Sequence, residues 1–307
     1  MKSETAFEIL NKDIKKACEN LGKREIIFLV NLYYDIQEQR IGMGSRVREM
    51  LKIEEPGVLY NFLFNSMESF ELRIKQGLTY YIKKSDSPVI AWLMSICGIA
   101  EIFTSGLMAH LDINEDATLK DEEGNYVKIF GRNPSSFWKY AGYTPGQRRQ
   151  RGVKLNYNPA LKRLCYLIGE SFVKFQNNKK DFYGKIYAQY KQKLTERNEN
   201  LEFKEAAEQH LKDFDYDKNT DAYKAYIQGK LPKLHIHNRA TRYVVKLFLC
   251  HLHQVMYYFK YNKAPKLPYI LVHPDYPEHQ TFIDIPNKPF TIEAEIPEMP
   301  QNINQSL

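Results

Sequence analysis

A run of cationic side chains stands out in this 307-residue sequence, between two apolar stretches. Residues 144–163 hold six Lys or Arg and no Asp or Glu. The six are Arg148, Arg149, Arg151, Lys154, Lys162 and Arg163. An uninterrupted cationic run flanked by Gly and Pro is typical of a surface that contacts a phosphate backbone. The run therefore predicts nucleic-acid binding.

A second polar group precedes and enters an apolar segment, residues 240–261, whose spacing predicts a helix. Its members are His235, His237, Asn238, Arg239, Arg242 and Lys246. The positive end of a helix dipole favours phosphate, so we expect a second basic surface at the start of this helix. Buried histidines and solvated arginines are the alternative.

Histidine spacing also raises the question of a metal site. His235 and His237 are two residues apart, and so are His251 and His253. On a helix, side chains two residues apart point about 200° apart, so His251 and His253 cannot share one ion. We expect no metal site.

A glycine lies in the short segment Cys97-Gly98-Ile99-Ala100, between two apolar stretches. This resembles the hairpin of a helix-hairpin-helix, in which a glycine backbone approaches a phosphate and offers its N–H groups. Gly98 is therefore a candidate contact, and an ordinary turn between helices is the alternative.

Catalytic groups are harder to find. The sequence has no Gly-rich phosphate loop of the nucleotide-hydrolase type, and acidic runs such as Glu54-Glu55 and Asp112 to Asp116 have no His or Ser partner at useful spacing. Ser105 and Tyr143 are the least poor candidates for a nucleophile. We expect neither an enzyme nor a cofactor.

Composition predicts a globular protein, with 43% hydrophobic residues and a formal charge of +7. The four Cys are far apart, which argues against a zinc ribbon or a disulfide framework and fits a reducing compartment. Residues 1–22 lack the features of a signal peptide, and the apolar stretches are too short to span a bilayer. We expect a cytoplasmic protein that does not contact membranes.

Helical spacing over residues 4–21, 23–52 and 56–84 predicts an N-terminal helical arm, residues 1–85. Gly42 and Gly44 are positions where the second helix is expected to break. The inward set expected for the third helix is Leu59, Phe62, Leu63, Phe70, Ile74, Leu78 and Tyr81. Such an arm either pairs two copies of the chain or packs on its own chain, and the sequence favours neither.

The rest of the chain predicts a mainly α architecture with one β-hairpin insertion at 113–131, inside a domain of residues 86–263. Helix starts are expected at Pro88, at Asn133-Pro134 and at Asn158-Pro159. Residues 180–215 predict a charged helical hairpin. A Pro-rich tail is expected from residue 264 to residue 307.

Residues 92–174 resemble the C-terminal domain of the bridge-RNA-guided insertion-sequence transposases, which is itself similar to the Nop domain of box C/D ribonucleoproteins. The segments that carry the resemblance are Cys97–Ala100, Thr104–Leu107, Ala141–Pro145, Arg148–Lys154 and Asn158–Lys174. With the helical arm in front and the His237–His251 helix behind, the chain resembles the Tas proteins of TIGR-Tas systems.

Two departures shape what the resemblance implies. Residues 1–90 lack the acidic residues of the transposases' RuvC-like domain, and residues 147–157 lack their serine nucleophile. The resemblance then implies a homodimeric Nop-domain protein of prokaryotic or phage origin that binds a guide RNA for recognition of target DNA, with any nuclease acting in trans. A catalytically inactive, transposase-derived DNA-binding protein is the alternative, and an enzyme with an unrecognised nucleophile is a third.

Overall fold

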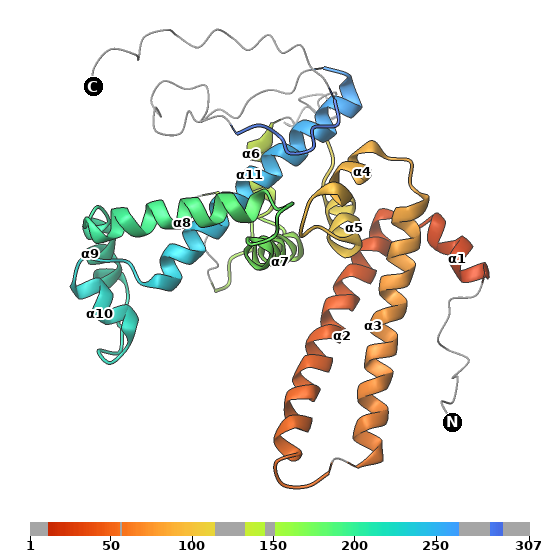
Figure 1. Cartoon of the computed structure of the whole chain (residues 1–307), viewed down its shortest axis with the longest axis horizontal. Coiled ribbons are helices and arrows are strands. Elements are labelled where there is room, and N and C mark those ends of the chain that lie inside the picture. Colours follow the sequence, from red (N-terminus) through yellow and green to blue (C-terminus); the bar gives the residue numbers. More distant parts are fainter. Residues whose placement is uncertain (1–11, 56, 114–132, 145–150, 264–282, 291–307) are drawn as a thin grey trace.

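The computed structural model describes residues 12–55, 57–113, 133–144, 151–263 and 283–290, which are mainly helical (Figure 1). The predicted mainly α class is confirmed for these ranges. The predicted β-hairpin lies outside the described residues except at its first position, Ile113.

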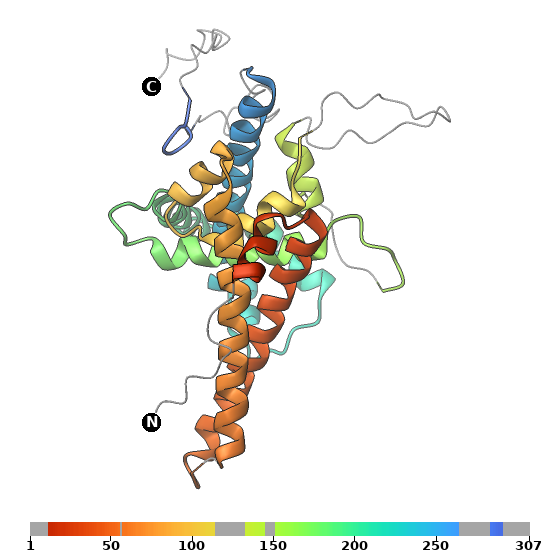
Figure 2. The same ribbon diagram turned by 90° about the vertical axis from the view of Figure 1, so that its right-hand side faces the viewer.

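The arm consists of α1 (Lys12–Glu19), α2 (Lys23–Met50) and α3 (Val58–Lys84). Helices α2 and α3 form an antiparallel hairpin that projects from the rest of the molecule in both views (Figures 1 and 2). The expected break at Gly42 and Gly44 does not occur, because α2 is continuous through both residues. A Cβ on Gly44 would lie 3.2 Å from the Phe64 ring, so this glycine permits close helix packing.

A polar cluster holds α2 and α3 in register. The carboxylate of Glu71, on α3, accepts hydrogen bonds from Arg40 Nε at 2.7 Å and from Gln37 Nε2 at 2.9 Å, both on α2. Burial alone would raise the pKa of Glu71, but these hydrogen bonds outweigh it and the pKa lies below its ordinary value. Glu71 is therefore ionised at neutral pH and fixes the pairing of the two helices.

The inward set predicted for α3 is right only near the body. Ile74 and Leu78 are buried, whereas Leu59 and Phe62 are each 64% exposed, and Leu63 and Phe70 are exposed as well. The prediction was wrong for the outer half because α3 extends beyond the body there, so that only α2 is beside it (Figure 1).

The body contains α4 (Pro88–Ser95), α5 (Glu101–His110), α6 (Pro134–Tyr140), α7 (Pro159–Phe175), α8 (Tyr183–Glu199), α9 (Lys204–Asp213), α10 (Asp221–Ile227) and α11 (Lys233–Tyr261). The predicted helix starts are confirmed. The side chains of Asn133 and Asn158 accept hydrogen bonds from the amides of Ser136 and Leu161, at 3.2 and 3.1 Å. Helices α8 and α9 occupy the two segments predicted to be helical, but α8 packs on α11 and α7 and α9 packs on α10, which was not predicted.

Helix α11 is the centre of the body. It packs against α4, α6, α7 and α8, and every residue from Phe248 to Tyr257 is buried. The rings of Phe172, Tyr183 and Phe248 meet with centroids 4.7 to 5.4 Å apart. Helix α11 begins at Lys233, seven residues before the predicted start, with Pro232 at its N-cap position.

Part of the expected tail completes this core. The indole of Trp92 donates to the Pro286 carbonyl at 2.9 Å, His251 Nε2 lies 2.9 Å from the Ile283 carbonyl, and Phe290 stacks on Tyr258 at 4.2 Å. Residues 283–290 are therefore integrated into the body, whereas the sequence favoured a separate tail from residue 264.

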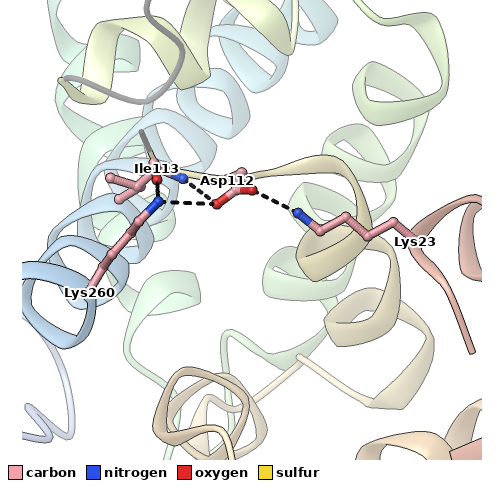
Figure 3. A network of polar contacts seen from close by, with 4 residues as sticks. All are labelled: Lys23, Asp112, Ile113 and Lys260. Carbon is pink, nitrogen blue, oxygen red and sulfur yellow. Dashed lines mark hydrogen bonds and ion pairs between the residues drawn. The ribbon is translucent and has the colours of Figure 1, made fainter. Parts of the chain in front are cut away.

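An ionic cluster joins the arm to the body (Figure 3). Asp112, just after α5, accepts a hydrogen bond from Lys23 Nζ at 2.8 Å, and its other oxygen lies 4.0 Å from Lys260 Nζ. Lys260 also donates to the Ile113 carbonyl. Burial alone would raise the pKa of Asp112. The hydrogen bonds from Lys23 and Ile113 outweigh this effect, and the pKa lies below its ordinary value. One ionised carboxylate thus ties the start of α2 to the ends of α5 and α11.

Within the described ranges, no helix has both the length and the apolar content that a membrane crossing requires.

Candidate nucleic-acid interface

Three cations of α11 form what we call the cationic row: Arg239, Arg242 and Lys246. Their spacing of three and four residues puts them on one face of the helix. Each charge lies over an aromatic ring, and the distances to the ring centroids are 4.8 Å for Arg239, 5.2 Å for Arg242 and 4.4 Å for Lys246. The rings belong to Phe203, Tyr143 and Trp138, in the same order. The row is therefore held in a fixed position along the helix.

Helix α6 and the turn after it are attached to α11 by the residues of the row. The Trp138 indole donates to the Lys246 carbonyl at 2.8 Å, and the Arg242 guanidinium donates to the Tyr143 carbonyl at 3.4 Å. At the other end, the Phe203 ring contacts the guanidinium groups of both Arg239 and Arg197, which are 4.8 and 5.2 Å from its centroid. The backbone segments on both sides of the row are thus fixed.

The charges of the row are poorly compensated inside the protein. Burial lowers the pKa of Lys246, and the neighbouring Arg242 charge lowers it further. Burial also lowers the pKa of Arg239. In the part of the chain that the structure describes, no carboxylate is paired with any of the three. An anion bound beside them would relieve both effects, so the row is a suitable place for phosphate.

The basic loop, residues 147–154, follows Tyr143 in the sequence, and Tyr143 is a partner of the row. The two ends of the loop are held together, since the Asn158 amide donates to the Tyr140 carbonyl at 2.8 Å and the Asn158 side chain donates to the Tyr140 hydroxyl at 2.8 Å. Arg151 and Lys154 are exposed. Arg148 and Arg149 lie outside the described residues.

Lys162 belongs to the base of this loop. Its ammonium lies 4.4 Å from the centroid of the Tyr157 ring. Gly142 has a φ of +75°, and a Cβ there would meet the Tyr157 ring at 3.0 Å and the Lys162 side chain at 3.1 Å. Because Tyr143, which follows this glycine, contacts Arg242, Lys162 and the cationic row belong to one basic region.

Arg163 is not part of this region. Its guanidinium pairs with Asp35 and Glu38 of α2, both at 3.1 Å. The side chain is therefore engaged with the arm, and its nucleic-acid contact stays a prediction that this pairing does not favour.

His235 and His237, which precede the row on α11, have their own partners or are partly buried. His237 Nδ1 lies 2.6 Å from the Tyr187 hydroxyl and its Nε2 lies 3.4 Å from Glu170, so both ring nitrogens are engaged. Burial lowers the pKa of His235 to about 4, with smaller effects from Arg239 and His210. The helix dipole acts mainly within the first turn of a helix. Because α11 begins at Lys233, the cationic row lies beyond that turn. Direct charge, rather than the dipole, is what the row offers.

Gly98 is in the predicted turn between α4 and α5, with a φ of +89°. A Cβ there would meet the Ser171 hydroxyl at 3.2 Å, and Ser171 Oγ donates to the Gly98 carbonyl at 2.7 Å. Contact with α7 is sufficient to explain the glycine, as in an ordinary turn between helices.

The candidates for other chemistry are dispersed. His251 contacts Tyr183, whereas the His253 ring is 5.2 Å from that of Phe137, so the two imidazoles have different neighbours. Ser105 is fully buried, and burial raises the pKa of Tyr143. Among the described residues, no three His, Cys, Asp or Glu side chains gather in a way that could hold a metal ion.

Sequence reasoning missed the aromatic partners of the row. Trp138 and Tyr143 precede the basic loop, which is a signal that could have been used, but nothing local connects either of them, or Phe203, to α11.

A comparison with protein-family models, curated proteins and solved structures finds no match for this chain. Fold and site therefore define its class by themselves. In the described ranges it is a helical protein with a projecting two-helix hairpin and a row of cations that contact aromatic rings.

Proposed function

We propose that this protein binds RNA along the cationic row and the basic loop, as the guide-RNA-binding component of a ribonucleoprotein that recognises target DNA. The observation that supports this most directly is the row itself, three fixed cations on one helix face without carboxylate partners in the described ranges. The resemblance of residues 86–263 to a Nop domain supplies the finer assignment to a guide RNA, with any nuclease acting in trans.

The geometry favours contact with phosphates over stacking on bases. Trp138 has one cation over its ring and Phe203 has two, and Tyr143 is buried. From Arg239 to Lys246 the helix advances about 10 Å, so the row is longer than one phosphate group and can follow a strand. Binding of this kind positions a strand without reading its sequence, as a protein requires when pairing between guide and target supplies the specificity.

The first experiment is purification of the full chain under low salt, followed by nuclease treatment and sequencing of bound nucleic acid. We expect RNA of defined length to co-purify and to be removed by ribonuclease but not by deoxyribonuclease. DNA binding without RNA would favour the transposase-derived alternative. Absence of both, together with no affinity for added RNA, would reject the proposal.

Replacing Arg148, Arg149, Arg151 and Lys154 by Ala should weaken RNA binding and reduce its salt dependence. Each lost phosphate contact makes the slope of log affinity against log salt shallower by about 0.7 to 0.9. Folding should survive, because Arg151 and Lys154 are exposed. Filter-binding titrations at several salt concentrations measure the effect.

A matched control removes four exposed lysines from α8, α9, α10 and the segment between the last two. These are Lys193, Lys212, Lys218 and Lys224. The control should keep more affinity than the loop variant at the same net charge. Equal losses in the two variants would mean that total charge, and not the loop, determines binding.

We further propose that the protein is a homodimer joined at the outer end of its arm. Apolar side chains are exposed there, including Ile53 at 89% and Val58 at 87%. The same end of the arm carries two basic residues of α2, Arg46 and Arg48, and the acidic pair Glu54-Glu55. A two-fold contact between copies could bury the apolar residues and pair opposite charges.

Replacing Leu59 and Phe62 by Ser should therefore convert the dimer into a monomer. Each buried Leu or Phe contributes about 1.5 to 3 kcal/mol, and symmetry doubles the loss, so the dissociation constant should rise at least about 100-fold. Light scattering across a concentration series measures the mass. Phe28→Ser, which changes a residue of α2 with the same 64% exposure, is the control. If the unmodified protein is a monomer, the alternative is supported, in which the arm packs only on its own chain.

A further inference from the structure

A second basic feature lies on the arm, far along the chain from the cationic row. Helix α1 lies on the side of α3 that faces away from α2 (Figure 1). A cavity of about 340 Å³ lies between α1 and α3. Its polar lining comes from Lys15 on α1 and from Lys75, Gln76, Thr79 and Lys83 on α3. The positions on α3 recur every three or four residues, so they share one face of the helix.

All the charged residues of the lining are lysines. The lining contains three lysines, a threonine and a glutamine, and no residue with a carboxylate. Glu19, on α1, is paired instead with Lys84 at 3.9 Å. Within the described ranges, none of the three cavity lysines forms an ion pair. Packing of α1 on α3 does not require three like charges around a cavity, whereas an anion would offset their repulsion.

The cavity also has an apolar side. The ring of Tyr80 and the side chain of Leu72 complete the lining, beside the lysines. Its volume is at the lower end of the range of about 300 to 1,000 Å³ that is common for small-molecule sites. From Lys75 to Lys83 the helix advances about 12 Å, which exceeds the length of one phosphate and accommodates a phosphate together with a sugar or a base.

We propose that this cavity binds a nucleotide, with the lysines on its phosphate groups and Tyr80 beside its sugar or base. The ligand is either a free nucleotide or one nucleotide of a nucleic-acid strand, since both offer the same chemistry. The site uses no residue of the cationic row or the basic loop, so this proposal can be tested independently of the RNA binding proposed for them.

Calorimetric titration of the full chain with ATP, adenosine and tripolyphosphate tests the proposal. We expect ATP to bind with one site per chain, tripolyphosphate to bind more weakly, and adenosine to show no measurable binding. Lys75→Ala with Lys83→Ala should weaken ATP binding roughly tenfold, because two charge-assisted contacts are lost. The control Lys193→Ala with Lys212→Ala, made at exposed lysines of α8 and α9, should leave the affinity unchanged. Thermal melting checks that both variants fold.

A five-nucleotide RNA titrated in parallel distinguishes the two sources. If ATP fails to bind but the Lys75 and Lys83 substitutions weaken RNA binding more than the control does, the nucleotide belongs to a strand. Removing charge from Arg242 and Lys246 should not alter ATP binding, which separates this site from the row. If neither ligand responds to the Lys75 and Lys83 substitutions, the proposal is wrong.

Discussion

Substituting Gln for Arg239, Arg242 and Lys246 together should reduce RNA affinity at least about 100-fold in 50 mM salt, because three phosphate contacts are lost. The slope of log affinity against log salt should become shallower by about 2 to 3. Gln keeps part of each aliphatic stem over its ring, so packing on Trp138 and Phe203 is largely preserved. Titration of a labelled RNA at four or more salt concentrations gives both quantities.

The same number of charges removed from Lys193, Lys212 and Lys218 provides the control. If this variant loses as much affinity as the row variant, the row has no special role. A Lys-for-Arg change at Arg239 and Arg242 should give an intermediate loss, since Lys keeps the charge but lacks the planar, forked donors of Arg. Unchanged affinity and slope in the Gln variant would reject the interface on α11.

Gly184→Ala should destabilise the protein by about 3 kcal/mol or more. An added Cβ would lie 2.4 Å from the Phe172 carbonyl oxygen and 2.7 Å from the Gln176 Cα, and backbone atoms cannot move aside cheaply. It would also lie 2.5 Å from the Asp181 carboxylate, which accepts hydrogen bonds from the Gly184 and Lys185 amides at the start of α8. Denaturant unfolding followed by circular dichroism measures the change.

Gly42→Ala is the matched control. Gly42 is also inside a helix, but nothing lies within 4 Å of the position of its Cβ. Because Ala favours helix over Gly by about 1 kcal/mol, this change should leave stability equal or higher. Similar losses in both variants would show that the close contact at Gly184 does not limit stability.

Local signals predicted most helices correctly. Asparagine before proline defined the starts of α6 and α7, and the periodic apolar residues of α2 and α3 defined a hairpin. These features depend on a few adjacent residues, so no knowledge of the rest of the chain was needed.

What the sequence could not show was the partner of each side chain. Lys162 and Arg163 are neighbours in the chain, yet one lies over Tyr157 beside the basic loop and the other pairs with Asp35 on the arm. Likewise Leu63 and Ile74 are 11 residues apart and share one face of α3, yet only Ile74 has the body beside it and is buried. Such differences arise from contacts between distant segments, which periodicity does not encode.

Residues 283–290 also affect the order in which the molecule can be completed during its synthesis. Trp92 donates its indole hydrogen to Pro286, 194 residues later. At about 5 to 20 residues per second, translation separates the two by roughly 10 to 40 s. During that interval the arm and α4 have already been made, while the surface of Trp92 awaits both α11 and its final cover. The core around α4 therefore stays incomplete until residues 283–290 have been made.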